Sequence, residues 1–93
     1  MSKFRIFETD EFLKKLKGLP SSDASLIRKK LDEYVYPQLR EEPFFGTNIK
    51  KLRAYSTDIW RYRIGRFRVF YTVDQDEDVI FVLTVDLRRD TYR

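Results

Sequence analysis

The sequence predicts an α+β fold in which an N-terminal strand and an antiparallel two-helix hairpin precede a mainly antiparallel β-sheet of about four strands. Three observations predict it. Apolar residues recur at helical spacing in two early segments, side chains alternate as in strands across residues 59–73, and residues 79–85 are apolar or β-branched. The helical hairpin is expected to pack on one face of the sheet and to leave the other face open.

The N-terminal part predicts a strand followed by a short helix. Residues 3–7 alternate between polar and apolar side chains. Thr9 or Asp10 then offers a cap for a helix of about two turns, and Gly18 ends it. The stripe that this helix is expected to bury consists of Phe12, Leu13 and Leu16.

A longer helix is expected next, with Ser21 or Ser22 at its start. Pro37 is expected to kink or end it near Tyr36, with one further turn through Leu39, because proline cannot donate a helical hydrogen bond. The few residues between the two helices predict that they pack as an antiparallel hairpin. The residues at helical spacing are Ile27, Leu31, Tyr34 and Val35.

The second half of the chain predicts the sheet. A loop at residues 43–48 leads into a strand from Ile49, which residues 56–58 interrupt. Residues 59–73 predict a hairpin that turns at Gly65-Arg66. Residues 79–85 predict a strand buried on both faces and therefore central in the sheet.

Strand alternation predicts which side chains share a face. If Arg61 and Arg63 point away from the helices, then Trp60, Tyr62 and Ile64 point toward them. The next strand of the hairpin carries Arg68 among apolar residues. By the same alternation Arg88 shares a face with Thr84 and Val82, so it reaches the arginine face only at the end of the last strand.

Composition narrows the classes of function. The 93 residues predict one domain, 1–93, with no cysteine for disulfides and no histidine for acid–base work at neutral pH or for metal binding. No metal site is expected, since the acidic turn at 74–78 lacks the calcium-loop pattern. No segment approaches membrane-spanning length, so we expect a cytoplasmic protein without a membrane partner.

Basic residues are concentrated in one part of the chain. Between Asn48 and Arg68 only Asp58 opposes seven of them, although the net charge of the chain is only +4. Such a patch is typical of nucleic-acid binding, whereas many charge runs are simply solvated. The seven are Lys50, Lys51, Arg53, Arg61, Arg63, Arg66 and Arg68.

The order of elements, together with three segments, resembles the RelE/ParE superfamily of toxins from type II toxin–antitoxin pairs. Residues 43–52 are similar to the family's loop and strand start after the second helix. Residues 62–71, Tyr-Arg-Ile-Gly-Arg-Phe-Arg-Val-Phe-Tyr, resemble its central hairpin. Residues 85–93 resemble its terminal segment. The resemblance covers nearly the whole chain and is strongest for the RelE branch, which implies a single RelE-like toxin domain.

The resemblance implies a messenger-RNA endonuclease that acts on the ribosome, uses the 2′-hydroxyl as nucleophile and needs neither metal nor cofactor. It also implies a cognate antitoxin as a protein partner. The catalytic residues that it implies are Arg61, Arg63, Arg68, Arg88 and Tyr92. Further basic residues are expected to bind the RNA backbone: Lys50, Lys51, Arg53, Arg66 and Arg89.

Two departures from the family's residues leave alternative functions open. Asp86-Leu87 stands where the family often has Gly-His, and arginine, with a pKa of about 12 or more, hardly transfers protons. Tyr92 is then the candidate for proton transfer. The chain could instead be a ParE-like poison of DNA gyrase, or a catalytically degenerate member that only binds a partner. The aromatic residues of the hairpin, Trp60, Tyr62, Phe70 and Tyr71, are expected in the core rather than as platforms for bases.

Overall fold

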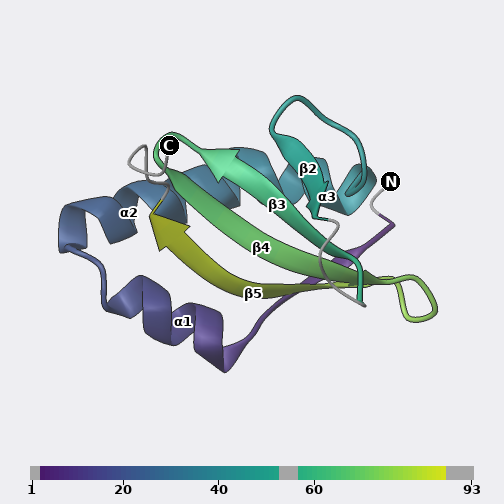
Figure 1. Ribbon diagram of the computed structural model, residues 1–93, viewed down its shortest axis with the longest axis horizontal. Coiled ribbons are helices and arrows are strands. Elements are labelled where there is room, and N and C mark those ends of the chain that lie inside the picture. The colour runs from purple at the N-terminus through teal and green to yellow at the C-terminus, as the bar shows by residue number, and fades with distance from the viewer. Residues whose placement is uncertain (1–2, 53–56, 88–93) are drawn as a thin grey trace.

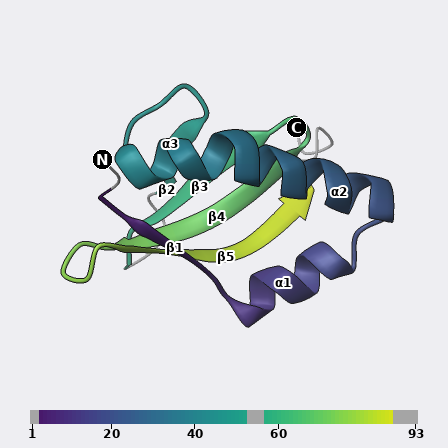
Figure 2. The same ribbon diagram turned by 180° about the vertical axis from the view of Figure 1, so that it is seen from behind.

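The computed structural model describes residues 3–52 and 57–87 and places helices on one side of a five-stranded sheet (Figure 1, Figure 2). The strands lie in the order β1-β5-β4-β3-β2. They are β1 (Arg5–Glu8), β2 (Ile49–Leu52), β3 (Ile59–Ile64), β4 (Phe67–Asp74) and β5 (Val79–Leu87). The helical segments are α1 (Asp10–Lys17), α2 (Ser21–Lys30), a π-helical turn η1 (Leu31–Val35) and α3 (Tyr36–Glu41).

The predicted α+β class is confirmed, and the sheet differs from the prediction in one respect. The strands from β2 to β5 are antiparallel neighbours, whereas β1 pairs in parallel with β5. The N-terminal strand thus makes the sheet five strands wide rather than four. A parallel neighbour requires a long crossover connection, and here that connection includes all the helical segments and the strands β2, β3 and β4.

The first helix begins as predicted and is attached to β5 through its cap. The Thr9 side chain accepts a hydrogen bond from the backbone N–H of Phe12 at 3.2 Å. The same hydroxyl donates to the carbonyl oxygen of Val82 at 2.7 Å. Phe12 and Leu16 are buried, whereas Leu13 is exposed. The cap therefore fixes the start of α1 beside the middle of β5.

The second helix continues past Pro37 because its turn widens just before the proline. The Tyr36 N–H donates to the carbonyl of Leu31, five residues back, in η1. A wide turn moves carbonyl groups away from the proline ring, so α3 continues to Glu41, beyond the predicted end at Leu39. The helix begins at Ser21, as predicted, with Pro20 at the cap position and no side-chain hydrogen bond to the cap.

The hairpin between β3 and β4 turns at Gly65-Arg66, as predicted. Gly65 has φ of +57°, and Arg66 does not have a positive φ. A positive φ at the first of two turn residues is typical of a type II′ hairpin, which favours glycine there. The turn sets the register of the two strands, so that Arg63 lies opposite Arg68.

A bulge in β5 changes which residues share a face. Phe70 pairs with Thr84, and the next residue, Tyr71, pairs with Val82, so Leu83 is an extra residue on β5. Val82 is buried under the helices, whereas Thr84 lies opposite Phe70 on the other face. The prediction that Val82 and Thr84 share a face is therefore wrong.

The core lies between the sheet and the helices. It contains residues from every layer, including Phe12, Ile27, Leu31, Leu39, Tyr71, Ile80 and Val85. The strand β5 is an interior strand, but only its helix-facing side is fully buried. Phe81, Leu83 and Thr84 stay partly exposed, so the prediction of burial on both faces is wrong.

Candidate functional site

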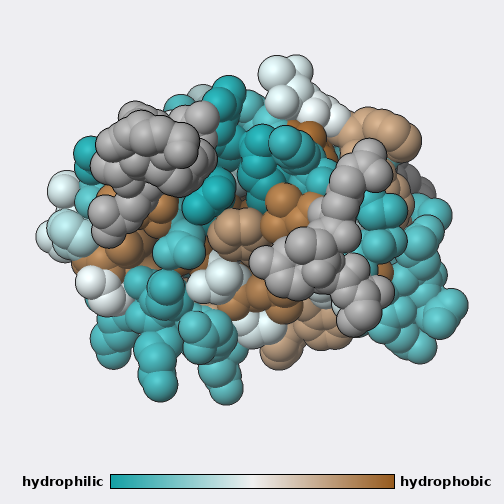
Figure 3. Space-filling model, in the orientation of Figure 1, coloured by the Kyte–Doolittle hydropathy of each residue, from teal (hydrophilic) through white to brown (hydrophobic). Residues whose placement is uncertain are grey.

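The candidate site lies on the outer face, defined here as the face of the sheet opposite the helices. Side chains alternate strictly along β3 and β4, and Tyr62, Ile64, Phe67 and Val69 are buried on the helix side. Arg61 and Arg63 on β3 and Arg68 on β4 therefore point to the outer face, as the sequence predicts. Figure 3 views this face and shows hydrophilic and hydrophobic side chains side by side on it.

Two of these arginines lie directly opposite each other. Arg63 and Arg68 are register partners across β3 and β4. Side chains in such positions have Cβ atoms about 5 Å apart, and like charges there destabilise a sheet. A pair of guanidinium groups at this position is thus unfavourable for folding alone, and an anion that binds between them would relieve the repulsion.

Arg61 lies two residues earlier on β3 and is held by the loop before β2. Its Nη1 donates to the carbonyl oxygen of Asn48 at 3.2 Å, and the backbone N–H of Arg63 donates to the same oxygen at 3.0 Å. Across the strands, Arg61 lies between Lys50 on β2 and Phe70 on β4. Asn48 therefore fixes both the backbone at Arg63 and the head group of Arg61.

Arg68 is partly buried and packs against an aromatic ring. Its guanidinium lies over the ring of Phe70, 5.6 Å from the ring centre. Its Nε is buried and finds no hydrogen-bond partner among residues 3–52 and 57–87. The guanidinium of Arg68 is thus held by packing against an aromatic ring, with donor capacity left over.

The predicted RNA-binding residues divide between the outer face and the molecule's edges. Lys50 is exposed opposite Arg61 on the outer face. Lys51 instead contacts Asp58 at 3.4 Å and lies 5.7 Å from the centre of the Trp60 ring. Arg66, in the hairpin turn, is directed to Asp23 of α2 at 3.9 Å. The structure therefore places only Lys50 of these three beside the arginines.

Four predicted site residues fall outside the described parts of the chain. They are Arg53, Arg88, Arg89 and Tyr92. β5 is described as far as Leu87, the residue before Arg88, and it pairs there with Phe67. The end of the described part of β5, at Leu87, thus lies beside the hairpin that carries Arg63 and Arg68.

The outer face also carries residues that sequence reasoning did not assign to a site. Asp86 is the register partner of Arg68 and forms an ion pair with Lys15 of α1 at 3.6 Å. Phe70 lies on the outer face between Arg61 and Thr84, so the prediction that it belongs to the core is wrong. Strand alternation starting from buried Val69 was the signal that could have placed Phe70 there.

A groove opens beside the arginines, at the edge of β3 that β2 does not cover. It has a volume of about 470 Å³ and is lined by residues of α2, η1, the loop before β2 and the hairpin, among them Lys30, Tyr34, Asn48 and Arg63. The Lys30 ammonium lies 5.1 Å from the centre of the Tyr34 ring. The groove adds a further cation at the border of the outer face.

Two further kinds of feature are absent from the described residues: a metal-binding cluster and a membrane-spanning helix. In residues 3–52 and 57–87 there is no group of three acidic side chains placed to hold a metal ion. The helices of the same residues include none that is long and apolar enough to cross a membrane. The arrangement that remains is a small α+β protein with helices on one face of its sheet and a cluster of arginines on the other.

Comparison with known proteins places this arrangement in a family. Residues 6–92 match the model of the ParE toxin of the type II toxin–antitoxin system parDE. A protein of Methanocaldococcus jannaschii named "Putative toxin RelE1" is 31% identical over 91 residues, covering 98% of this chain and 97% of that protein. The chain belongs to the ParE toxin family and is a toxin of the RelE/ParE superfamily of type II toxin–antitoxin systems.

Solved structures share the fold. The toxin–antitoxin complex RelBE2 of Mycobacterium tuberculosis contains a chain similar to this one with a TM-score of 0.72 and 22% identity, covering 92% of this chain and 99% of that chain. The archaeal RelE–RelB complex of Pyrococcus horikoshii gives a TM-score of 0.70 and 24% identity, over 96% and 99%. Both similarities confirm the RelE-like fold predicted from the sequence.

Proposed function

We propose that this toxin is a ribosome-dependent messenger-RNA endonuclease that inhibits translation. The observation that carries the proposal is the cluster of Arg61, Arg63 and Arg68 on the outer face, with two of them in directly opposed positions. Cationic groups in fixed positions stabilise the charge that develops on a phosphate during cleavage. The similarity to proteins named RelE supports the same branch of the superfamily.

In the proposed reaction the 2′-hydroxyl oxygen attacks the adjacent phosphorus, and the bond from phosphorus to the 5′-oxygen breaks. The proton of the 2′-hydroxyl goes to a base, and an acid gives a proton to the leaving 5′-oxygen. Arg63 and Arg68 hold the non-bridging oxygens, and Arg61, fixed by Asn48, orients the nucleophile. Neither cofactor nor metal is required, since the attacking group belongs to the RNA.

The roles of the terminal residues belong to the same proposal and rest on the family resemblance. Arg88 adds a further cation at the phosphate. Tyr92 transfers a proton, because its phenol is the one group of the matched set that can both give and accept one. Lys50, Lys51, Arg53, Arg66 and Arg89 bind RNA backbone, and the single domain at residues 1–93 acts in the cytoplasm.

The proposed partners are the ribosome with its messenger RNA and a cognate antitoxin. Two of the solved structures of similar fold are complexes of a RelE-type chain with an antitoxin. An antitoxin that covers the outer face would neutralise its arginines with acidic side chains. Such a complex is expected to weaken as salt concentration rises.

The test expresses the chain under tight control and follows protein synthesis and messenger-RNA integrity. Wild type is expected to arrest translation and to cut messenger RNA, whereas Arg68→Gln removes one cation from the outer face and should lower cleavage by about 100-fold. Lys29→Gln removes an equal charge from the exposed side of α2 and should behave as wild type. Intact messenger RNA during a growth arrest would contradict the proposal.

A second candidate is poisoning of DNA gyrase, because the matching family model is that of a ParE toxin. It predicts DNA damage and intact messenger RNA after induction. The two outcomes are distinguished in the same cultures by probing both nucleic acids. Absence of toxicity with retained antitoxin binding would instead indicate a member that only binds its partner.

A further inference from the structure

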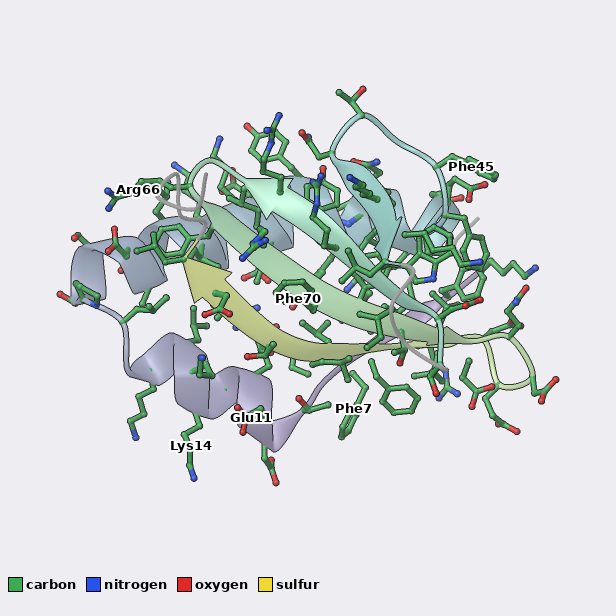
Figure 4. The ribbon with its side chains drawn as sticks, in the orientation of Figure 1. Phe7, Glu11, Lys14, Phe45, Arg66 and Phe70 are labelled. Carbon is green, nitrogen blue, oxygen red and sulfur yellow. The ribbon has the colours of Figure 1, made fainter. Side chains whose placement is uncertain are left out.

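The outer face carries three phenylalanine rings on neighbouring strands, and one of them, Phe70, lies beside the arginines. Phe70 is on β4, Phe81 on β5 and Phe7 on β1, and Phe81 and Phe7 are register partners. Their rings meet edge to face with centres 5.6 Å apart. Phe7 is 55% exposed, which is unusual for an aromatic side chain on a sheet. Figure 4 shows Phe70 and Phe7 on the viewer's side of the sheet.

The registers arrange this face in successive rows that cross the strands. The first row contains Arg63, Arg68 and Asp86, and the second contains Lys50, Arg61, Phe70 and Thr84. The third row contains Thr72, Phe81 and Phe7. Rows lie about 7 Å apart, since two residues separate them along each strand. The face thus changes from cationic to aromatic along β4 and β5.

Phe70 connects the two parts of the face. The guanidinium of Arg68 lies over its ring, and Arg61 is its register partner. An anion held by these arginines therefore lies next to an aromatic surface. Single-stranded RNA has this combination of groups, because each phosphate is joined through a sugar to a flat base that stacks on aromatic side chains.

We propose that Phe70, Phe81 and Phe7 form a platform on which unpaired bases of the RNA stack while the arginines hold the neighbouring phosphate. The inference rests on the proposed function and extends it, by assigning the path of the substrate across β4, β5 and β1. The position of Phe70 beside the cations favours RNA over a purely apolar protein segment, which would bring no anion to match the guanidinium charges.

The test measures binding without cleavage. The probe is a single-stranded oligonucleotide of 2′-O-methyl RNA, which lacks the attacking hydroxyl, and the comparison is an abasic oligonucleotide of the same length and charge. Wild type should bind the base-containing probe about 10-fold or more tightly than the abasic one. Phe7→Ala with Phe81→Ala should remove most of this difference, whereas Phe7→Tyr should retain it.

A matched variant separates stacking from charge. Arg63→Gln should weaken binding of both probes by a similar factor, because it removes a phosphate contact and no ring. Thermal unfolding of each variant checks that the fold is retained, and the exposure of Phe7 makes its replacement tolerable. Equal affinity of wild type for the two probes would overturn the platform, even for a chain that cuts messenger RNA.

The alternative ligand of the three phenylalanine rings is a protein partner in place of RNA. If the double phenylalanine variant keeps its preference for the base-containing probe but is no longer neutralised by a co-expressed antitoxin, the rings dock protein and the proposal is wrong. Failure of the proposed function is a separate result, since wild type would then leave messenger RNA intact in cells whatever its affinity for the probes.

Discussion

Arg63 and Arg68 face each other across β3 and β4 on the side of the sheet opposite the helices. The Gly65-Arg66 turn fixes this register, and the buried side chains on either side of each arginine fix the direction in which it points. The molecule therefore holds two like charges together at a cost to its stability. Binding of an anion between the two side chains, as in the proposed function, would offset this cost.

The first prediction separates the contribution of Arg63 to cleavage from its contribution to stability. Arg63→Gln should lower single-turnover cleavage by about 100-fold, because a preorganised cation at the phosphate is lost. It should leave the free energy of unfolding unchanged or raise it by about 0.5 kcal/mol, because the repulsion from Arg68 is removed. Urea unfolding measures the second effect. A clear loss of stability would show that Arg63 is a structural residue.

The second prediction concerns a polar cluster on the helix side of β1. The Glu8 carboxylate accepts hydrogen bonds from Arg28 and, at 2.6 Å, from the Tyr36 hydroxyl. Burial raises the pKa of Tyr36, and its hydrogen bond to Glu8 raises it further, so it donates as a phenol at any ordinary pH. Tyr36→Phe should lower the free energy of unfolding by about 1–2 kcal/mol in urea titrations.

The same cluster predicts a dependence of stability on pH. Burial alone would raise the pKa of Glu8, but the hydrogen bonds from Arg28 and Tyr36 and the charge of Arg28 outweigh it, and the pKa is lowered. The stabilisation is then fully present above the unfolded-state pKa, about 4.3, and is lost as the pH falls through the lower folded value. The stability difference between wild type and Glu8→Gln should shrink below about pH 4. The exposed Glu77→Gln should show no comparable change.

The third prediction concerns the turn that sets the arginine register. At Gly65 a Cβ atom would meet nothing within 4 Å, so only the φ of +57° opposes a side chain. Gly65→Ala should destabilise by about 1 kcal/mol, and Gly65→Asn by less, because asparagine tolerates the left-handed region. Gly18→Ala is the control, since Gly18 has φ of −78° and ordinary contacts. Equal shifts in the thermal unfolding temperature for the replacements at both glycines would contradict the role of the positive φ at Gly65.

The alternation of arginine and apolar residues along the strands made much of the arginine cluster predictable from the sequence. Apolar neighbours place Arg61, Arg63 and Arg68 on one face once the strands are recognised, and glycine marks the turn between them. The parallel pairing of β1 with β5 and the extra residue at Leu83 were not predictable, because both depend on contacts between distant segments. Phe70 was assigned to the core because it is aromatic, although its spacing of two residues from Arg68 on the same strand places it on the face of that arginine.

The fourth prediction concerns metal dependence. The proposed nucleophile belongs to the RNA and the proposed charges are arginines, so cleavage should survive rapid addition of EDTA to a preformed complex of toxin, messenger RNA and ribosome. Sedimentation of the ribosomes in parallel checks that they stay assembled during the measurement. A loss of cleavage on intact ribosomes would show that a metal ion takes part.

The last prediction concerns Tyr92, which lies outside the described residues and is assigned by family resemblance. Arginines supply charge but hardly move protons, and the chain has no histidine. If the Tyr92 hydroxyl transfers a proton, Tyr92→Phe should cleave far more slowly than wild type and about as slowly as Tyr92→Ala. If the ring only stacks on a base, Tyr92→Phe should cleave at the wild-type single-turnover rate while Tyr92→Ala does not. Arg88→Ala should be slower than either, since a lost cation at the phosphoryl transition state costs about 100-fold or more.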